Sequence, residues 1–114
     1  MTSLKRKVDF ATLFRKGRWI SPRDSNVRIR GLKWDQFQTA IAIPKKVGNA
    51  VRRNKARRQV REILRHLELT LFIRGRFVLI LNKDFVKNEF AEKRRELREI
   101  FQNFMARQNR GVSH

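Results

Sequence analysis

The chain has 114 residues, which is the size of one compact domain. It has no cysteine, so it can form neither a disulfide bond nor a metal site with thiolate ligands. Lysine and arginine number 29 against 10 acidic residues, which gives a formal charge of +19 and predicts a polyanionic partner. Hydrophobic residues make up 40% of the chain, which argues against disorder.

No apolar stretch approaches the roughly 20 residues of a transmembrane helix, and residues 1–6 are not followed by the apolar core of a signal peptide. The absence of cysteine suits a reducing compartment. We therefore expect a soluble, cytoplasmic protein that has no membrane partner.

The first half of the chain predicts one helix and three strands. Val8 to Lys16 repeats apolar residues at helical spacing, and Gly17 follows at the position of a left-handed helix cap. Alternating or β-prone residues bounded by turn residues then predict strands at 18–21, 26–30 and 37–43.

The second half predicts a helix, a strand and a helix. A basic segment becomes helical near Val51, and residues 77–81 are a continuous apolar run typical of an internal strand. Residues 87–107 return to helical spacing.

These elements predict a single domain over residues 1–114, in which about 108–114 form a frayed tail. Their order is α-β-β-β-α-β-α. The expected fold is an α+β two-layer sandwich with a four-stranded mixed sheet.

The basic segment divides into two faces on a helical wheel. One arc is apolar and consists of Ala56, Val60, Ile63, Leu64 and Leu67. The opposite arc is polar and basic and consists of Asn54, Arg57, Arg58, Arg61 and Arg65. Because arginine forms bidentate hydrogen bonds to phosphate oxygens, this pattern predicts a helix that packs on the sheet and binds a nucleic acid. Arg53 is expected to project past the apolar arc.

Three competing roles for this helix are weaker. Only Glu62 offers an ion-pair partner within the segment, so a passive, ion-paired surface is disfavoured. A DNA-binding helix would need a helix-turn-helix partner, and strands flank this helix on both sides. A membrane-surface helix would need the apolar residues that the core requires. A structural RNA-binding protein of the ribosomal-protein type remains the main alternative.

The sequence KKVGNAVRRNKARRQVRE, residues 45–62, resembles the RNR motif of the bacterial ribonuclease P protein subunit. The pattern of that family is K-K-x-G-x-A-V-x-R-N-x-x-K-R-x-x-R-E, and only Arg57, where the family more often has lysine, departs from it. Leu4, Asp9-Phe10, Phe14 and Gly17 are similar to the N-terminal pattern of the same family. The stretch 22–36 and the C-terminal tail match by pattern only.

This resemblance implies a fold with a left-handed βαβ crossover, against the usual handedness. It also implies a function as the protein subunit of an endoribonuclease that removes the 5′ leader from precursor tRNA. The partners would be the catalytic RNA and the precursor tRNA, with no obligate protein partner. The RNA would carry out catalysis and would hold most of the Mg²⁺, so no catalytic or metal-binding protein residue is expected.

The resemblance also assigns site residues. The RNA-binding residues would be Lys45, Lys46, Arg52, Arg53, Asn54, Lys55, Arg57, Arg58, Arg61 and Arg65. The leader-binding cleft, between the first helix and the sheet, would use Phe10, Phe14 and Arg28. Ordinary core packing stays an alternative for the two phenylalanines. Because the chain has no tyrosine, leader binding is expected to depend more on charge than on stacking.

The remaining titratable residues predict no protein nuclease. His66 is expected to cap the end of the basic helix, and neither it nor His114 has a metal-ligand or general-base companion by spacing. Acidic residues of the last helix alternate with cations, and Glu89 and Lys93 form an i,i+4 pair. This pattern predicts a solvated, ion-paired face.

Overall fold

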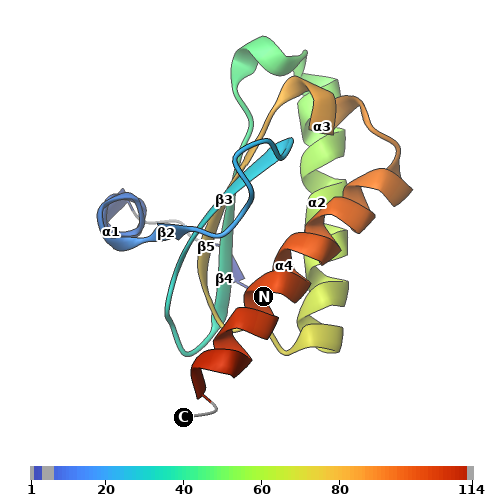
Figure 1. Cartoon of the computed structure of the whole chain (residues 1–114). Helices are drawn as coiled ribbons and strands as arrows, with labels where there is room; N and C mark the ends of the chain where they lie inside the picture. Colours follow the sequence, from blue (N-terminus) through green and yellow to red (C-terminus); the bar gives the residue numbers. More distant parts are fainter. Residues whose placement is uncertain (1, 4–6, 113–114) are drawn as a thin grey trace.

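The computed structural model describes residues 2–3 and 7–112, and it describes side chains for residues 11–108. A mixed sheet lies between helix α1 on one side and helices α2, α3 and α4 on the other (Figure 1). The strands are β1 (Thr2–Ser3), β2 (Arg18–Trp19), β3 (Val27–Leu32), β4 (Phe37–Ala42) and β5 (Gly75–Leu81). The helices are α1 (Lys7–Lys16), a short 3-10 turn (Lys45–Val47), α2 (Ala50–Leu71), α3 (Lys83–Lys87) and α4 (Phe90–Val112).

The strand order is β1-β4-β5-β3-β2. β4 and β5 are parallel neighbours joined through α2, and β3 pairs antiparallel with β5. The four predicted strands are therefore confirmed within a mixed sheet, and the two-residue β1 adds to its edge beside β4. The left-handed sense of the crossover stays a prediction.

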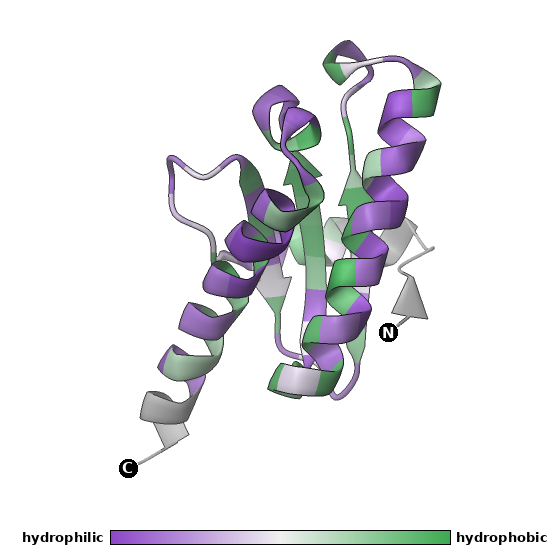
Figure 2. Ribbon diagram, turned by 90° about the vertical axis from the view of Figure 1, so that its right-hand side faces the viewer, coloured by the Kyte–Doolittle hydropathy of each residue, from purple (hydrophilic) through white to green (hydrophobic). Residues whose placement is uncertain are grey.

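The main core lies between the sheet and the helices α2 and α4. Phe77 of β5 lies at the centre of this core. The Phe77 ring packs edge-on against the rings of Phe37, Phe101 and Phe104, at centroid distances of 5.6, 5.2 and 5.5 Å. The backbone N–H of Asn26 donates to the Glu96 carboxylate at 2.9 Å, which ties α4 to the start of β3. In Figure 2 the outer surfaces of the helices are mainly hydrophilic, and the strands behind them are mainly hydrophobic.

The opposite face of the sheet carries a smaller core beneath α1. Leu13 is fully buried there against Ala40 and Val78. The prediction of a left-handed cap at Gly17 was wrong, because its φ is not positive. Glycine is needed there for a close approach instead, since a Cβ atom at Gly17 would lie 2.4 Å from the Leu13 carbonyl oxygen.

Two predicted helix boundaries differ from the structure. α2 continues past His66 to Leu71, and Phe72 caps it in the left-handed conformation, so the predicted cap at His66 was wrong. The last helix, expected from residue 87, begins at Phe90 instead, and a short helix α3 that Asn82 caps precedes it and ends before Asn88. α4 then continues into the predicted frayed tail, as far as Val112. No helix within residues 2–3 and 7–112 is long and apolar enough to cross a membrane.

Candidate nucleic-acid interface

Helix α2 is fixed at its start and along one side. The Asn49 side chain accepts a hydrogen bond from the Arg52 N–H at 2.9 Å, a standard N-cap that stabilises the first turn. The buried residues of the helix are those of the predicted apolar arc, Ala56, Val60, Ile63, Leu64 and Leu67. The wheel prediction is confirmed, and the opposite arc must therefore face solvent.

That opposite arc forms a basic ridge, which consists of Asn54, Arg57, Arg58, Arg61 and Arg65. All of its residues are exposed except Arg57, which is half-buried. The Arg57 Nη1 atom donates a long hydrogen bond of 3.4 Å to the Asn54 side-chain oxygen. Lys45 and Lys46 are exposed on the 3-10 turn before α2, where buried Val47 anchors the turn. Arg52 and Lys55 are exposed on the first turns of the helix. These predicted RNA-binding cations thus lie on two consecutive elements, the 3-10 turn and α2.

Arg53 differs from this set. It is half-buried, and its Nε atom is buried without a hydrogen-bond partner among the described residues. The stem therefore packs against the protein rather than projecting freely, which corrects the sequence prediction for this side chain. An unpaired buried donor is costly in a native fold. A ligand that supplied an acceptor at this point would remove that cost.

A second polar surface lies on the sheet face that α1 leaves partly uncovered. Trp19 pairs in register with Arg30, so both point to this face. The Arg28 guanidinium carbon lies 4.2 Å from the centre of the Trp19 ring, and that of Arg76 lies 3.5 Å from the centre of the Trp34 ring. We call this surface the open sheet face and define it by Trp19, Arg28, Arg30, Trp34 and Arg76.

The predicted cleft residues have different outcomes. Arg28 is exposed on the open sheet face, and Phe14 is 43% exposed, so it is not a core residue. The side chain of Phe10 lies outside the described residues. Sequence reasoning missed the two tryptophans, and each is 43% exposed. The alternation of Trp19 with Ile20 in a strand is the signal that could have placed Trp19 opposite the main core.

The acidic and histidine side chains form no cluster of three or more that could hold a metal ion within the described part of the chain. Glu92 pairs with Arg95 at the surface, as expected of an ion-paired face. Lys93 contradicts that expectation, because it is only 4% exposed and donates from its Nζ to the Gln59 side-chain oxygen at 2.7 Å. Position 93 faces α2 rather than solvent, which spacing along α4 alone did not indicate.

The pKa of Lys93 reflects this burial. Desolvation lowers this pKa from the ordinary lysine value of 10.5, the positive charge of Lys55 lowers it further, and Glu89 opposes the shift. Lys93 is thus a buried amine in positive surroundings, between the basic helix and α4.

A basic helix held rigidly on one side of a sheet, together with arginine and tryptophan on the other, defines a small RNA-binding protein. The sequence model of the ribonuclease P family matches residues 1–105, and the chain belongs to this family. Membership gives it the role of a protein subunit of ribonuclease P and decides against the ribosomal-protein alternative.

Two curated relatives match this chain over 60% and 95% of its length. The ribonuclease P protein component of an Exiguobacterium species is 33% identical over 110 residues, which cover 95% of this chain and 94% of that one. The component from Mycoplasmopsis pulmonis is 34% identical over 68 residues, or 60% of this chain and 61% of that one. The solved RNase P protein of Staphylococcus aureus has the same fold, with a TM-score of 0.77 at 22% identity over 90% of this chain and 94% of that chain.

Proposed function

We propose that this chain binds the catalytic RNA of ribonuclease P through α2 and assists removal of the 5′ leader from precursor tRNA. The observation that supports this most strongly is the basic ridge, which five buried apolar residues hold outward along one rigid helix. The contact would use the ridge together with Lys45, Lys46, Arg52, Arg53 and Lys55. Such a surface recognises phosphates by charge and by the fork geometry of arginine.

The open sheet face would bind the 5′ leader. An unpaired strand is held by cations that follow its phosphates and by aromatic rings on which its bases stack. Arg28 and Arg76 provide the charge, and Trp19 and Trp34 provide half-exposed rings that are already oriented by cation–π contacts. Stacking would therefore contribute more than the absence of tyrosine suggested.

Hydrolysis of the phosphodiester belongs to the RNA on this proposal. Mg²⁺ prefers several oxygen ligands, and the described side chains offer no acidic cluster for it, so the RNA would hold the ion. The ion supplies Lewis-acid chemistry and activates water when it is bound. The protein residues would position the RNA and the leader and would neutralise phosphate charge, without an obligate protein partner and in the cytoplasm.

The test is reconstitution. The purified chain alone should not cleave precursor tRNA, and a bacterial ribonuclease P RNA at low Mg²⁺ should cleave at the 5′ end only once the chain is added. The cut should be mapped by primer extension, with mature tRNA as the control substrate. Cleavage by the protein alone, or an RNA reaction that the protein does not change, would contradict the proposal.

A further inference from the structure

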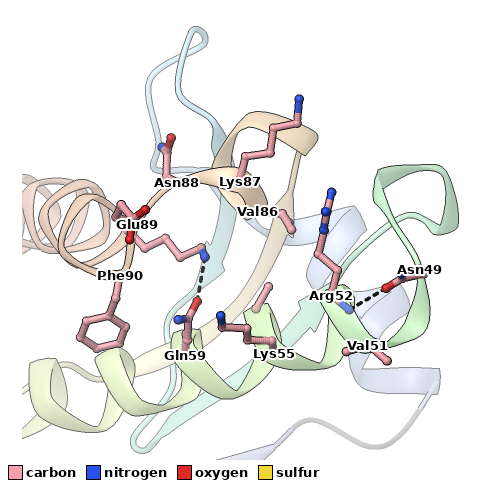
Figure 3. Close-up of a pocket in the computed structure, with 12 residues that line it drawn as sticks. Asn49, Val51, Arg52, Lys55, Gln59, Val86, Lys87, Asn88, Glu89 and Phe90 are labelled. Carbon is pink, nitrogen blue, oxygen red and sulfur yellow. Dashed lines mark hydrogen bonds between the residues drawn. The ribbon is translucent and has the colours of Figure 1, made fainter.

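Two cavities of similar size lie on different parts of the fold. One of about 580 Å³ lies between α2, α3 and the start of α4, and its Arg52 and Lys55 already belong to the proposed RNA contact (Figure 3). The other, of about 550 Å³, lies where the edge strand β2 and the end of β3 meet the last turns of α4. Among the described residues, this second cavity shares none with the basic ridge and only Trp19 with the open sheet face.

This second cavity, which we call the edge pocket, has an apolar wall that consists of Trp19, Ile20, Leu32 and Phe104. Trp19 is half-exposed, and Phe104 is only partly buried although its ring packs on Phe77 of the main core. Aromatic rings in a concave site bind flat aromatic ligands by stacking. The wall of the edge pocket therefore suits the base of an unpaired nucleotide.

The rim of the edge pocket is positive. Four exposed cations belong to its lining, namely Lys16, Arg18, Lys33 and Arg107, and no acidic residue is among the described residues that line it. Proteins hold single-stranded RNA with this combination, in which cations follow the phosphates and aromatic rings stack on the bases. Charge alone would suit any anion. The apolar wall beside it favours a nucleotide over a free phosphate.

Arg107 of α4 is held at the edge of β2. Its Nη2 atom donates a hydrogen bond to the Ile20 carbonyl oxygen at 3.2 Å. A guanidinium has five N–H donors, and this hydrogen bond uses one of them. The other donors can bind the edge of a base, as arginine does with the N7 and O6 atoms of guanine. Because the guanidinium is already oriented, such a contact would cost little side-chain entropy.

The edge pocket adjoins the open sheet face through Trp19, which lines the pocket and also lies against Arg28. An RNA strand that follows the open sheet face would therefore reach the pocket at β2. We propose that the edge pocket binds one unpaired nucleotide of the 5′ leader, with the base between Trp19 and Phe104 and in contact with Arg107. The phosphate of this nucleotide lies on the cationic rim. This inference rests on the proposed function and adds α4 to the leader contact.

Guanosine 5′-monophosphate tests the pocket itself, titrated into the full chain without RNA at constant ionic strength. A Trp34→Phe background leaves Trp19 as the one tryptophan, and its fluorescence should be quenched as the base stacks. Ribose 5-phosphate carries the same phosphate without a base and should leave the fluorescence unchanged. Equal quenching by both compounds, or by neither, would overturn the proposal. Because no RNA is present, this result does not depend on reconstitution.

Matched arginine variants place the nucleotide in the edge pocket. Arg107→Gln should weaken binding of guanosine 5′-monophosphate about tenfold, since it removes a charged hydrogen bond to the base. Arg98→Gln removes an equally exposed arginine of α4 outside the lining and should leave the midpoint unchanged. Both side chains are exposed, so neither variant should impair folding. Equal midpoints for the two variants would contradict a contact with Arg107.

Abasic substitutions then locate the nucleotide within the leader. Each leader position of precursor tRNA is made abasic in turn, and affinity for the reconstituted complex is measured with the wild-type, Arg107→Gln and Arg98→Gln proteins. At one position the loss should be large with the wild-type and Arg98→Gln proteins and about tenfold smaller with Arg107→Gln, because the missing base and the missing arginine are partners. Affinity for mature tRNA should be the same for all three proteins. If the Arg107→Gln profile parallels the wild-type profile at every position, the edge pocket does not bind the leader.

Discussion

Arg53 and Lys93 show how single side chains carry a cost that a ligand could relieve. Arg53 buries an unpaired Nε donor, and Lys93 buries an ammonium with one partner among the described residues. Arg53 lies on the first half of α2, and Lys93 of α4 packs against the same helix. The proposed function places anionic RNA at this helix. Buried polar groups of this kind lower the stability of the free protein, and their retention makes sense when a bound partner completes the hydrogen bonding.

Replacing Arg53 by methionine should separate stability from binding. Methionine keeps most of the packing of the arginine stem and removes the unpaired donor, so Arg53→Met should raise the free energy of unfolding by about 1 kcal/mol. The same change should weaken binding to the catalytic RNA. Denaturant unfolding and filter binding measure the two effects.

The control is Arg58→Met on the exposed ridge. It should change stability by less than about 0.5 kcal/mol, because surface substitutions away from special contacts have small effects. If Arg53→Met proves clearly destabilising, the buried Nε must have a partner in solution, and no ligand is needed to satisfy it.

Helix α2 combines two functions because its two faces are independent. One face contributes apolar residues to the main core, and the other contributes charge to the surface. Substitutions on the ridge should therefore alter RNA binding with little effect on folding. This separation is what allows the ridge to be tested by simple truncation.

The double change Arg57→Ala and Arg61→Ala should weaken assembly with the catalytic RNA. If each arginine contacts one phosphate, the slope of log affinity against log salt should fall in magnitude by about 1.5. Thermal unfolding should change little. The matched control is Arg94→Ala with Arg98→Ala, an exposed i,i+4 pair on α4 with the same loss of charge. Equal slopes for the two double variants would mean that only net charge matters, and a large loss of stability would mean that the ridge arginines are structural.

Sequence predicted what depends on local periodicity and missed what depends on packing between distant segments. The five buried residues of α2 follow from a 3.6-residue repeat, and the structure confirms them. The burial of Lys93 depends on where α4 crosses α2, which brings position 93 to Gln59. The contact of Trp19 with Arg28 depends on the register of β2 against β3. Neither the burial of Lys93 nor the contact of Trp19 with Arg28 can be predicted from the spacing of residues within one segment.

At the scale of the whole molecule, the sheet separates two surfaces of different chemistry. The basic ridge lies on the helix side, and the open sheet face lies on the side of α1 (Figure 1). On the proposed function, one small domain would contact two nucleic acids at once, and its charge of +19 suits the high density of phosphates around it. A substitution on one surface should therefore not change nucleic-acid binding at the other surface.

Trp19→Ala tests this separation. Loss of one stacked base is worth roughly 1–3 kcal/mol, so the reconstituted complex should bind precursor tRNA with a leader more weakly by that amount. Its affinity for mature tRNA, and the affinity of the protein for the catalytic RNA, should not change. Phe72→Ala is the control, because Phe72 is an exposed aromatic ring at the far end of α2. An equal loss for both tRNAs, or the same loss from Phe72→Ala, would show that the open sheet face does not recognise the leader.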